Sequence, residues 1–274
     1  MYNVRVKKFL DTVQIIVYSE VIFCSEEEKH SKRVKELNPF TGKKEKLLTL
    51  EERDDNLARS QAVSRKRTIN AIYDIARSNE WEWFFTLTFN PDKLDSFDYT
   101  LCSKKLSQWL NNMKKKAPDM KYIVVPEQHK SGRWHFHGLF ANVGSMQFVD
   151  SGLVDKKGKI IYNVGNYRLG FSTATRIDDV RRASSYLCKY ITKNLCTDTK
   201  GRKRYWASKN VDLPIVEDYL FNTREVLDDL LCVDDAHIKM VRGEVYDVHY
   251  IDIPIYKTNT YLSNRSIIFF HNML

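Results

Sequence analysis

Two apolar runs, KYIVVPE at residues 121–127 and WHFHGLF at residues 134–140, decide the fold predicted for this chain. Both runs are short and rich in aromatic and β-branched residues, which is typical of buried strands. Residues 129–133 lie between them and contain Ser-Gly, which predicts a tight turn. The two runs therefore predict an antiparallel hairpin at the centre of the fold.

The elements on either side of this hairpin predict an α+β protein. Strands or hairpin arms are expected at residues 12–23, 83–89, 152–162, 167–176, 202–208 and 238–255. Helical spacing of apolar residues predicts helices over residues 55–78, 99–116 and 177–194 and an acidic helix over residues 217–232. Regular β-α alternation is absent, so the pattern favours a mostly antiparallel sheet with helices on one face over a parallel doubly wound sheet.

The charge of the chain is unevenly distributed. The 274 residues include 44 Lys or Arg and 35 Asp or Glu, for a net charge of +9. Residues 211–274 hold 5 basic and 11 acidic residues, a net charge of −6, which leaves +15 on residues 1–210. The first three quarters of the chain are therefore the candidate surface for a polyanion.

Cysteine usage and hydropathy indicate a cytoplasmic protein. The five cysteines are odd in number and form no CxxC, which favours reduced thiols over a disulfide framework or a zinc ribbon. No apolar run approaches the ~18 residues that a membrane helix needs, so we expect no membrane partner. Residues 1–23 are interpreted as part of the fold and not as a signal peptide.

The hairpin carries candidate metal ligands. His135 and His137 are two residues apart in a strand, so both imidazoles project from one face and can bind one divalent ion. Glu127, directly before the turn, would lie within ~5.5 Å of its partner on the neighbouring strand and can supply an oxygen ligand. Gln128 and His129 compete for this third place. The set suits Mg or Mn completed by phosphate, and zinc is chemically possible.

The helix predicted over residues 177–194 carries candidate nucleophiles. Tyr186, Lys189, Tyr190 and Lys193 fall at i, i+3, i+4 and i+7, on one helix face. Neighbouring ammonium charge and a metal-bound phosphate favour attack by a phenol, which is a weak nucleophile at its reference pKa of about 10.

Together these elements resemble the HUH endonucleases, specifically the rolling-circle replication initiators of plasmids and single-stranded DNA phages. Three motifs follow one another in the expected order: FFTLTF at residues 84–89, the HUH motif WHFHGLF at residues 134–140, and YLCK at residues 186–189. YLCKYITK at residues 186–193 also resembles the two-tyrosine form of phage initiators. The resemblance covers roughly residues 56–214.

The resemblance implies a ferredoxin-like or RRM-like core and strand-specific nicking of origin DNA. It implies that His135, His137 and a third ligand, Glu127, hold Mg or Mn, which polarises the scissile phosphate. Tyr186 would attack the phosphorus and leave a 5′-phosphotyrosine and a free 3′-OH for a host polymerase. The reverse step would rejoin the ends. Lys189 would neutralise phosphate charge, and Tyr190 would be a second nucleophile, although one-tyrosine initiators share the motif without it.

On this basis three segments are expected. Residues 1–54 are an N-terminal strand and charged segment, residues 55–214 are the endonuclease domain, and residues 215–274 are an acidic helix and hairpin that could contact a host helicase, mediate oligomerisation or cap the core. Basic and aromatic side chains are expected to bind single-stranded DNA. They are Arg65, Arg67, Arg133, Lys193, Arg204 and Trp206.

Two other interpretations stay open. A related HUH enzyme, either a transposase or a relaxase, would share the motifs, although relaxases usually carry three histidines and an early tyrosine. A non-catalytic nucleic-acid-binding module would retain the fold without the chemistry. The chain contains no Walker A phosphate loop, so no built-in helicase is expected.

Overall fold

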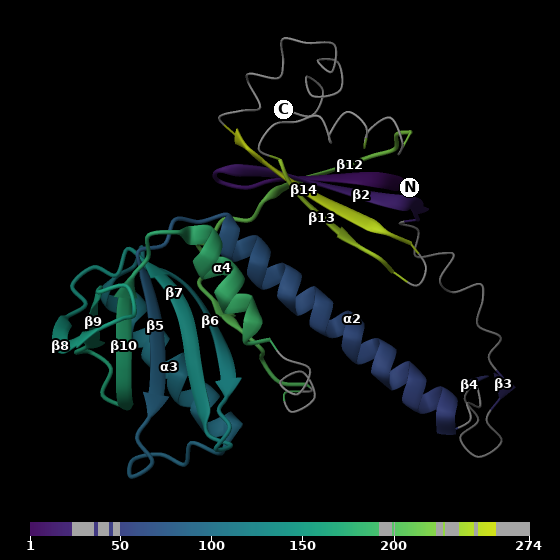
Figure 1. The fold of residues 1–274 in the computed structure, drawn as a ribbon. Helices are drawn as coiled ribbons and strands as arrows, with labels where there is room; N and C mark the ends of the chain where they lie inside the picture. The colour runs from purple at the N-terminus through teal and green to yellow at the C-terminus, as the bar shows by residue number, and fades with distance from the viewer. Residues whose placement is uncertain are drawn as a thin grey trace. The chain divides into compact units, whose positions relative to one another are not determined.

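The computed structural model describes residues 1–23, 36–37, 44–45, 50–191, 199, 201–222, 227, 236–243 and 246–255, the side chains of residues 50–56 excepted. The chain divides into two compact units. One is Leu57–Leu213, and the other combines Met1–Asn56 with Pro214–Leu274. Each unit contains its own antiparallel sheet (Figure 1).

The sheet of the Leu57–Leu213 unit has seven strands in the order β11-β6-β7-β5-β10-β9-β8, and all neighbouring strands are antiparallel. Its strands are β5 (Trp83–Phe89), β6 (Lys121–Gln128), β7 (Trp134–Ala141), β8 (Phe148–Val154), β9 (Ile160–Val164), β10 (Gly170–Arg176) and β11 (Trp206–Ala207). The predicted central hairpin is β6 and β7. Its turn closes with a hydrogen bond from the His129 amide to the Arg133 carbonyl at 2.9 Å, and Gly132 supplies the positive φ that the turn requires.

Helices cover both faces of this sheet, which corrects the expectation of helices on one face. They are α2 (Leu50–Arg77), α3 (Tyr99–Lys116) and α4 (Val180–Lys189). Figure 1 shows α3 behind the sheet and α4 in front of it. The α3 residue Trp109 packs edge-on against Phe140 of β7, whereas the α4 residue Tyr186 packs against Phe84 of β5. The sheet is therefore buried by α3 on one face and partly covered by α4 on the other.

Alternation along the strands assigns these two faces. In β5, Phe85 and Leu87 are fully buried, whereas Phe84, Thr86 and Thr88 between them are half-buried. The fully buried face joins Phe136 and other aromatic residues in the main core. Its period of two is the pattern of a strand with one face packed on a core, which is why the short aromatic run predicted a strand.

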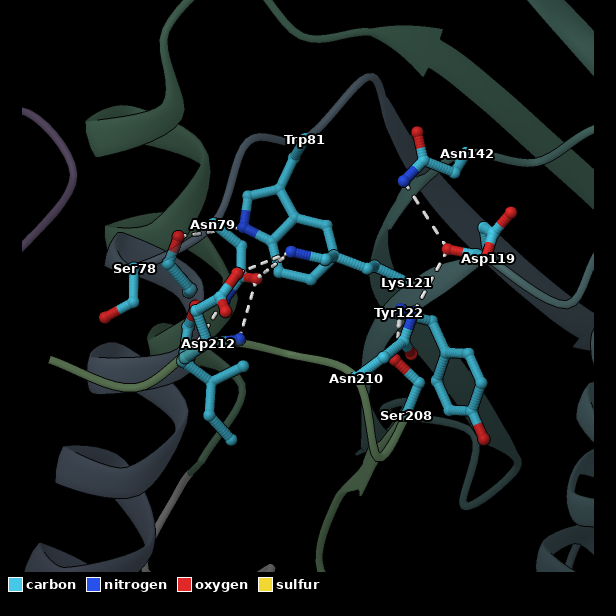
Figure 2. A network of polar contacts seen from close by, with 12 residues as sticks. Ser78, Asn79, Trp81, Asp119, Lys121, Tyr122, Asn142, Ser208, Asn210 and Asp212 are labelled. Atoms are coloured by element: carbon cyan, nitrogen blue, oxygen red, sulfur yellow. Dashed lines mark hydrogen bonds and ion pairs between the residues drawn. The ribbon is translucent and has the colours of Figure 1, made fainter.

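A polar network fastens the segment after β11 to the rest of the unit (Figure 2). The Asn79 side chain donates to the Asp212 carbonyl at 2.9 Å and accepts from the Asp212 amide at 2.9 Å. Lys121, at the start of β6, donates to Asn79 Oδ1 at 3.0 Å and forms an ion pair with Asp212 at 2.5 Å. These contacts hold the ends of α2, β6 and the segment after β11 together.

The second unit pairs strands from both ends of the described chain. Its five-stranded sheet has the order β12-β1-β2-β14-β13, with strands β1 (Tyr2–Lys8), β2 (Thr12–Ile22), β12 (Ile215–Tyr219), β13 (His237–Val241) and β14 (Val248–Pro254). The two-residue strands β3 (Glu36–Leu37) and β4 (Lys44–Glu45) pair separately. Pairing therefore joins the N-terminal segment to the acidic segment through backbone hydrogen bonds.

The acidic helix expected over residues 217–232 is wrong at its start, because Ile215–Tyr219 is a strand. Two ion pairs explain this outcome: Arg5 of β1 binds Asp218 at 2.7 Å, and Lys8 binds Glu217 at 3.3 Å. Part of the acidic charge is thus used against β1. Most of residues 220–232 lie outside the described residues.

The predicted α+β class with an antiparallel sheet flanked by helices is confirmed. Within the described ranges, no helix is long and apolar enough to cross a membrane.

Candidate functional site

The β6–β7 hairpin brings the predicted metal ligands to one face of the seven-stranded sheet. Glu127 lies directly opposite His135 in the antiparallel register. Gln128 lies opposite Trp134 and donates from its side chain to the Gly132 carbonyl at 3.1 Å, so it is turned toward the hairpin loop. Among the candidates for the third ligand, the register therefore favours Glu127 over Gln128.

Glu127 and His137 are in direct contact. Glu127 Oε2 lies 2.7 Å from His137 Nε2, and the His137 side chain is buried. The hydrogen bond from His137 lowers the pKa of Glu127, against an opposing effect of burial. Glu127 is therefore an ionised carboxylate at neutral pH, which is the state that a metal ligand requires.

Two threonines of β5 hold the other side of each imidazole. Thr86 Oγ1 lies 3.1 Å from His137 Nδ1, and Thr88 Oγ1 lies 3.3 Å from His135 Nδ1. Each threonine is the direct cross-strand partner of its histidine. A hydroxyl that accepts from Nδ1–H fixes the ring orientation and leaves the Nε2 lone pair for a metal, as outer-shell partners of metal-bound histidines do.

The donor chemistry fits a divalent ion. Two imidazoles and one ionised carboxylate are a suitable set for Mg, Mn or Zn. Burial lowers the pKa of His135, and the neighbouring His129 and His137 act in the same direction, so this ligand is neutral at pH 7. Within the described part of the chain, no three His, Cys, Asp or Glu side chains already converge as a metal cluster. The His135 ring stacks instead on His129, with centroids 5.2 Å apart.

Helix α4 brings two phenols to this cluster. Asp179 begins the helix by accepting from the Arg182 amide at 3.0 Å. The Tyr190 ring stacks on His137, with centroids 3.8 Å apart and planes 4° apart. The Tyr186 ring lies edge-on to Tyr190 at 5.3 Å. The i, i+4 spacing therefore puts both candidate nucleophiles beside the candidate ligands, as the sequence predicted for one helix face.

The two tyrosines differ in environment. Tyr186 is 48% exposed, whereas Tyr190 is half-buried. Burial raises the pKa of Tyr190, and its hydrogen bond with Tyr186 and the nearby Glu127 carboxylate act in the same direction. Lys189 Nζ lies 5.7 Å from the centroid of the Tyr186 ring, close enough to favour negative charge there. Tyr186 is thus the more accessible phenol.

Cys188 does not take part in this cluster. Its thiol points to the Ile69 carbonyl of α2 at 3.9 Å. Burial raises the pKa of Cys188 to about 12, so the group is an un-ionised thiol at neutral pH.

The basic residues predicted to bind DNA lie at different places in the unit. Arg133 is half-buried at the start of β7, with its guanidinium 5.3 Å from the centroid of the Phe97 ring. Arg65 and Arg67 lie on α2, and Arg204 donates to Ser64 of the same helix at 2.7 Å. Lys193 lies outside the described residues.

Trp206 differs from what the sequence predicted. It is 2% exposed, its indole N–H donates to Ser107 Oγ at 2.8 Å, and its ring packs edge-on against Phe136. A ring enclosed in the core has no free face for a base, so Trp206 is not part of the candidate DNA surface.

Sequence reasoning gave no role to Thr86 and Thr88. Both lie in the first motif, and the signal that identifies them is their alternation in β5 together with the register that sets them opposite His137 and His135. That register depends on which strand lies beside β7, and the order of strands is a tertiary property.

Comparison with known proteins agrees with the region that carries this site. Residues 82–195 match the model of a family described as replication-associated protein ORF2. No curated protein and no solved structure matches the chain. The matched residues extend from β5 through α4 and include the histidines, Glu127 and both tyrosines. The match supports a role in the initiation of DNA replication, with DNA as the partner.

Proposed function

We propose that this chain nicks single-stranded origin DNA strand-specifically and thereby initiates rolling-circle replication. One observation carries the proposal: Tyr190 stacks on His137 and Tyr186 lies beside it, next to the His137–Glu127 pair. Nucleophilic catalysis needs the attacking group beside the groups that stabilise the reacting centre. The similarity of residues 82–195 to a replication-associated family supports DNA as the substrate.

Tyr186 is the proposed nucleophile. Its phenol oxygen attacks the scissile phosphorus, a phosphotyrosine O–P bond forms, and the bond from phosphorus to the 3′-oxygen breaks. The phenolic proton is lost to solvent, and the leaving oxygen takes a proton to become a 3′-OH. A host polymerase would extend this end, and attack by a 3′-OH on the phosphotyrosine would later rejoin the strand.

The neighbouring residues have supporting roles. Lys189 is exposed and lies beside the Tyr186 ring, so its ammonium group would neutralise charge on the phosphate. Tyr190 would act as a second nucleophile at termination. Its raised pKa and its stacking on His137 make it the less reactive phenol in the arrangement described here.

Glu127, His135 and His137 would hold a Mg or Mn ion. When bound, such an ion supplies Lewis-acid polarisation of the phosphate. Thr86 and Thr88 would orient the two imidazoles toward the ion through Nδ1. Arg133, with Arg65, Arg67 and Arg204 on or against α2, would bind the phosphate backbone.

Covalent capture tests the proposal. A single-stranded origin oligonucleotide, labelled 3′ to the scissile phosphate, is incubated with the full chain and Mn or with EDTA, and adducts are resolved on a denaturing gel. We expect an adduct with Mn only. We expect Tyr186→Phe to abolish it and Tyr162→Phe, a tyrosine of β9 outside the site, to retain it.

Other outcomes assign other functions. Robust adduct from Tyr186→Phe would move the nucleophile to Tyr190. Binding without cleavage by the wild type would support a non-catalytic nucleic-acid-binding module. Cleavage followed by joining to an unrelated target strand would favour a transposase, and cleavage confined to a transfer origin would favour a relaxase.

A further inference from the structure

A cavity of about 390 Å³ lies at the end of β5, beside the candidate metal ligands. Thr88 lines it, and Thr88 Oγ1 is 3.3 Å from His135 Nδ1. In the sheet, Thr88 lies opposite Phe171 of β10 on one side and opposite His135 of β7 on the other. The cavity therefore opens on the same face of the sheet as the site, one strand away from His135.

A buried hydroxyl in the wall of this cavity has no partner. Ser96 is 2% exposed, and its Oγ makes no hydrogen bond with any described residue. Leaving such a group unsatisfied is costly, and buried side-chain polar atoms in folded proteins are nearly always bonded. Ser96 therefore points to a polar ligand that completes the cavity.

The rest of the lining combines an exposed ring with positive charge. Phe171 is 66% exposed although it lies in a sheet strand. Arg133 and Lys93 supply cations at the same cavity. Aromatic rings that stack on unpaired bases, beside cations that hold phosphates, are the features by which proteins bind single-stranded nucleic acid.

We propose that this cavity receives one unpaired nucleotide of the DNA strand, next to the phosphate that is cut. Its base would stack on Phe171 and bond to Ser96, and its phosphate would lie against Arg133 and Lys93. The volume lies within the range of small-molecule sites. This inference rests on the proposed function and adds to it a subsite that holds the strand in register.

A coupling experiment tests the subsite without requiring cleavage. Fluorescence anisotropy in EDTA measures the affinity of the full chain for labelled single-stranded origin oligonucleotides that carry one abasic nucleotide at each position in turn. We expect one position near the nick at which loss of the base weakens binding about 10-fold, the effect of one lost stacking contact. We expect Phe171→Ala to weaken binding of the intact strand about 10-fold and to bind that abasic strand no more weakly still.

Two variants serve as controls. Phe23→Ala removes another exposed phenylalanine, 57% exposed and in the other unit, and should change the affinity less than 2-fold. Phe171→Trp keeps a stacking ring and should retain the affinity of the wild type.

Three outcomes would overturn the subsite. The first is abasic losses that are the same in the wild type and in Phe171→Ala at every position. The second is equal losses for Phe23→Ala and Phe171→Ala. The third is competition by free deoxynucleoside monophosphates with no coupling on the oligonucleotide, which would assign the cavity to a free nucleotide. Nicking with no coupling would leave the proposed function intact and reject only the subsite, whereas coupling without nicking would reject only the chemistry.

Discussion

Strand β5 presents two surfaces that differ in every physical respect. Phe85 and Leu87 are fully buried in the main core, whereas Thr86 and Thr88, one residue along, hydrogen-bond to the imidazoles of β7. The same division holds in β7, where Phe136 faces the core and His135 and His137 face α4 and the hairpin turn.

The difference teaches that stability and chemistry are separated by a single residue along the chain. A strand sends successive side chains to opposite faces, so one face can be packed with apolar groups while the other carries polar groups. Substitutions on the two faces should therefore fail in different ways.

The largest effect should come from adjacent residues on opposite faces. Phe136→Ala removes a fully buried ring and should lower the free energy of unfolding by about 3–5 kcal/mol. His135→Ala removes a half-buried ring with one long hydrogen bond and should cost less than about 1 kcal/mol. Urea titration followed by circular dichroism measures both values.

The covalent-capture assay completes this comparison, because His135→Ala should abolish the adduct while the protein stays folded. Equal losses of stability for the two variants would show that the two faces of β7 are not separated as described.

The next effect distinguishes Glu127 from its neighbour in the sequence. Glu127→Ala should lower the affinity for Mn about 100-fold, because it removes a proposed ligand beside His137. Gln128→Ala should leave the affinity unchanged, because that side chain is bonded to Gly132 in the hairpin loop. Isothermal titration calorimetry measures both affinities, and the reverse result would move the third ligand to Gln128.

The smallest effect should come from the threonines. Thr86→Val keeps the shape of the side chain and removes the hydroxyl that bonds His137 Nδ1, so Mn affinity should fall about 10-fold. Thr86→Ser should restore it. Nitrogen chemical shifts of the imidazole report the tautomer directly, and a Thr86→Val protein with unchanged shifts and affinity would reduce Thr86 to a packing residue.

Much of the fold could be predicted from local patterns. The strand at Trp83–Phe89 and the helix at Tyr99–Lys116 have the expected boundaries because each pattern is strong and ends at a turn or cap. Ile215–Tyr219 was expected to be helical from Glu217 onward because its charges suit an exposed helix, yet pairing with β1 makes it a strand. Such pairing involves a segment far away in the sequence, which no local window contains.

The candidate site divides in the same way. Spacing alone predicted that His135 and His137 share a face and that Tyr186 and Tyr190 share a face, because strand and helix geometry fix both relations. Only the tertiary structure decided that the tyrosine face lies over His137, that Thr86 and Thr88 hold the imidazoles, that Trp206 is enclosed in the core, and that Ser96 and Phe171 line one cavity. The reason is physical: periodicity along the chain sets which side chains point the same way, but strand order and helix packing set what they meet.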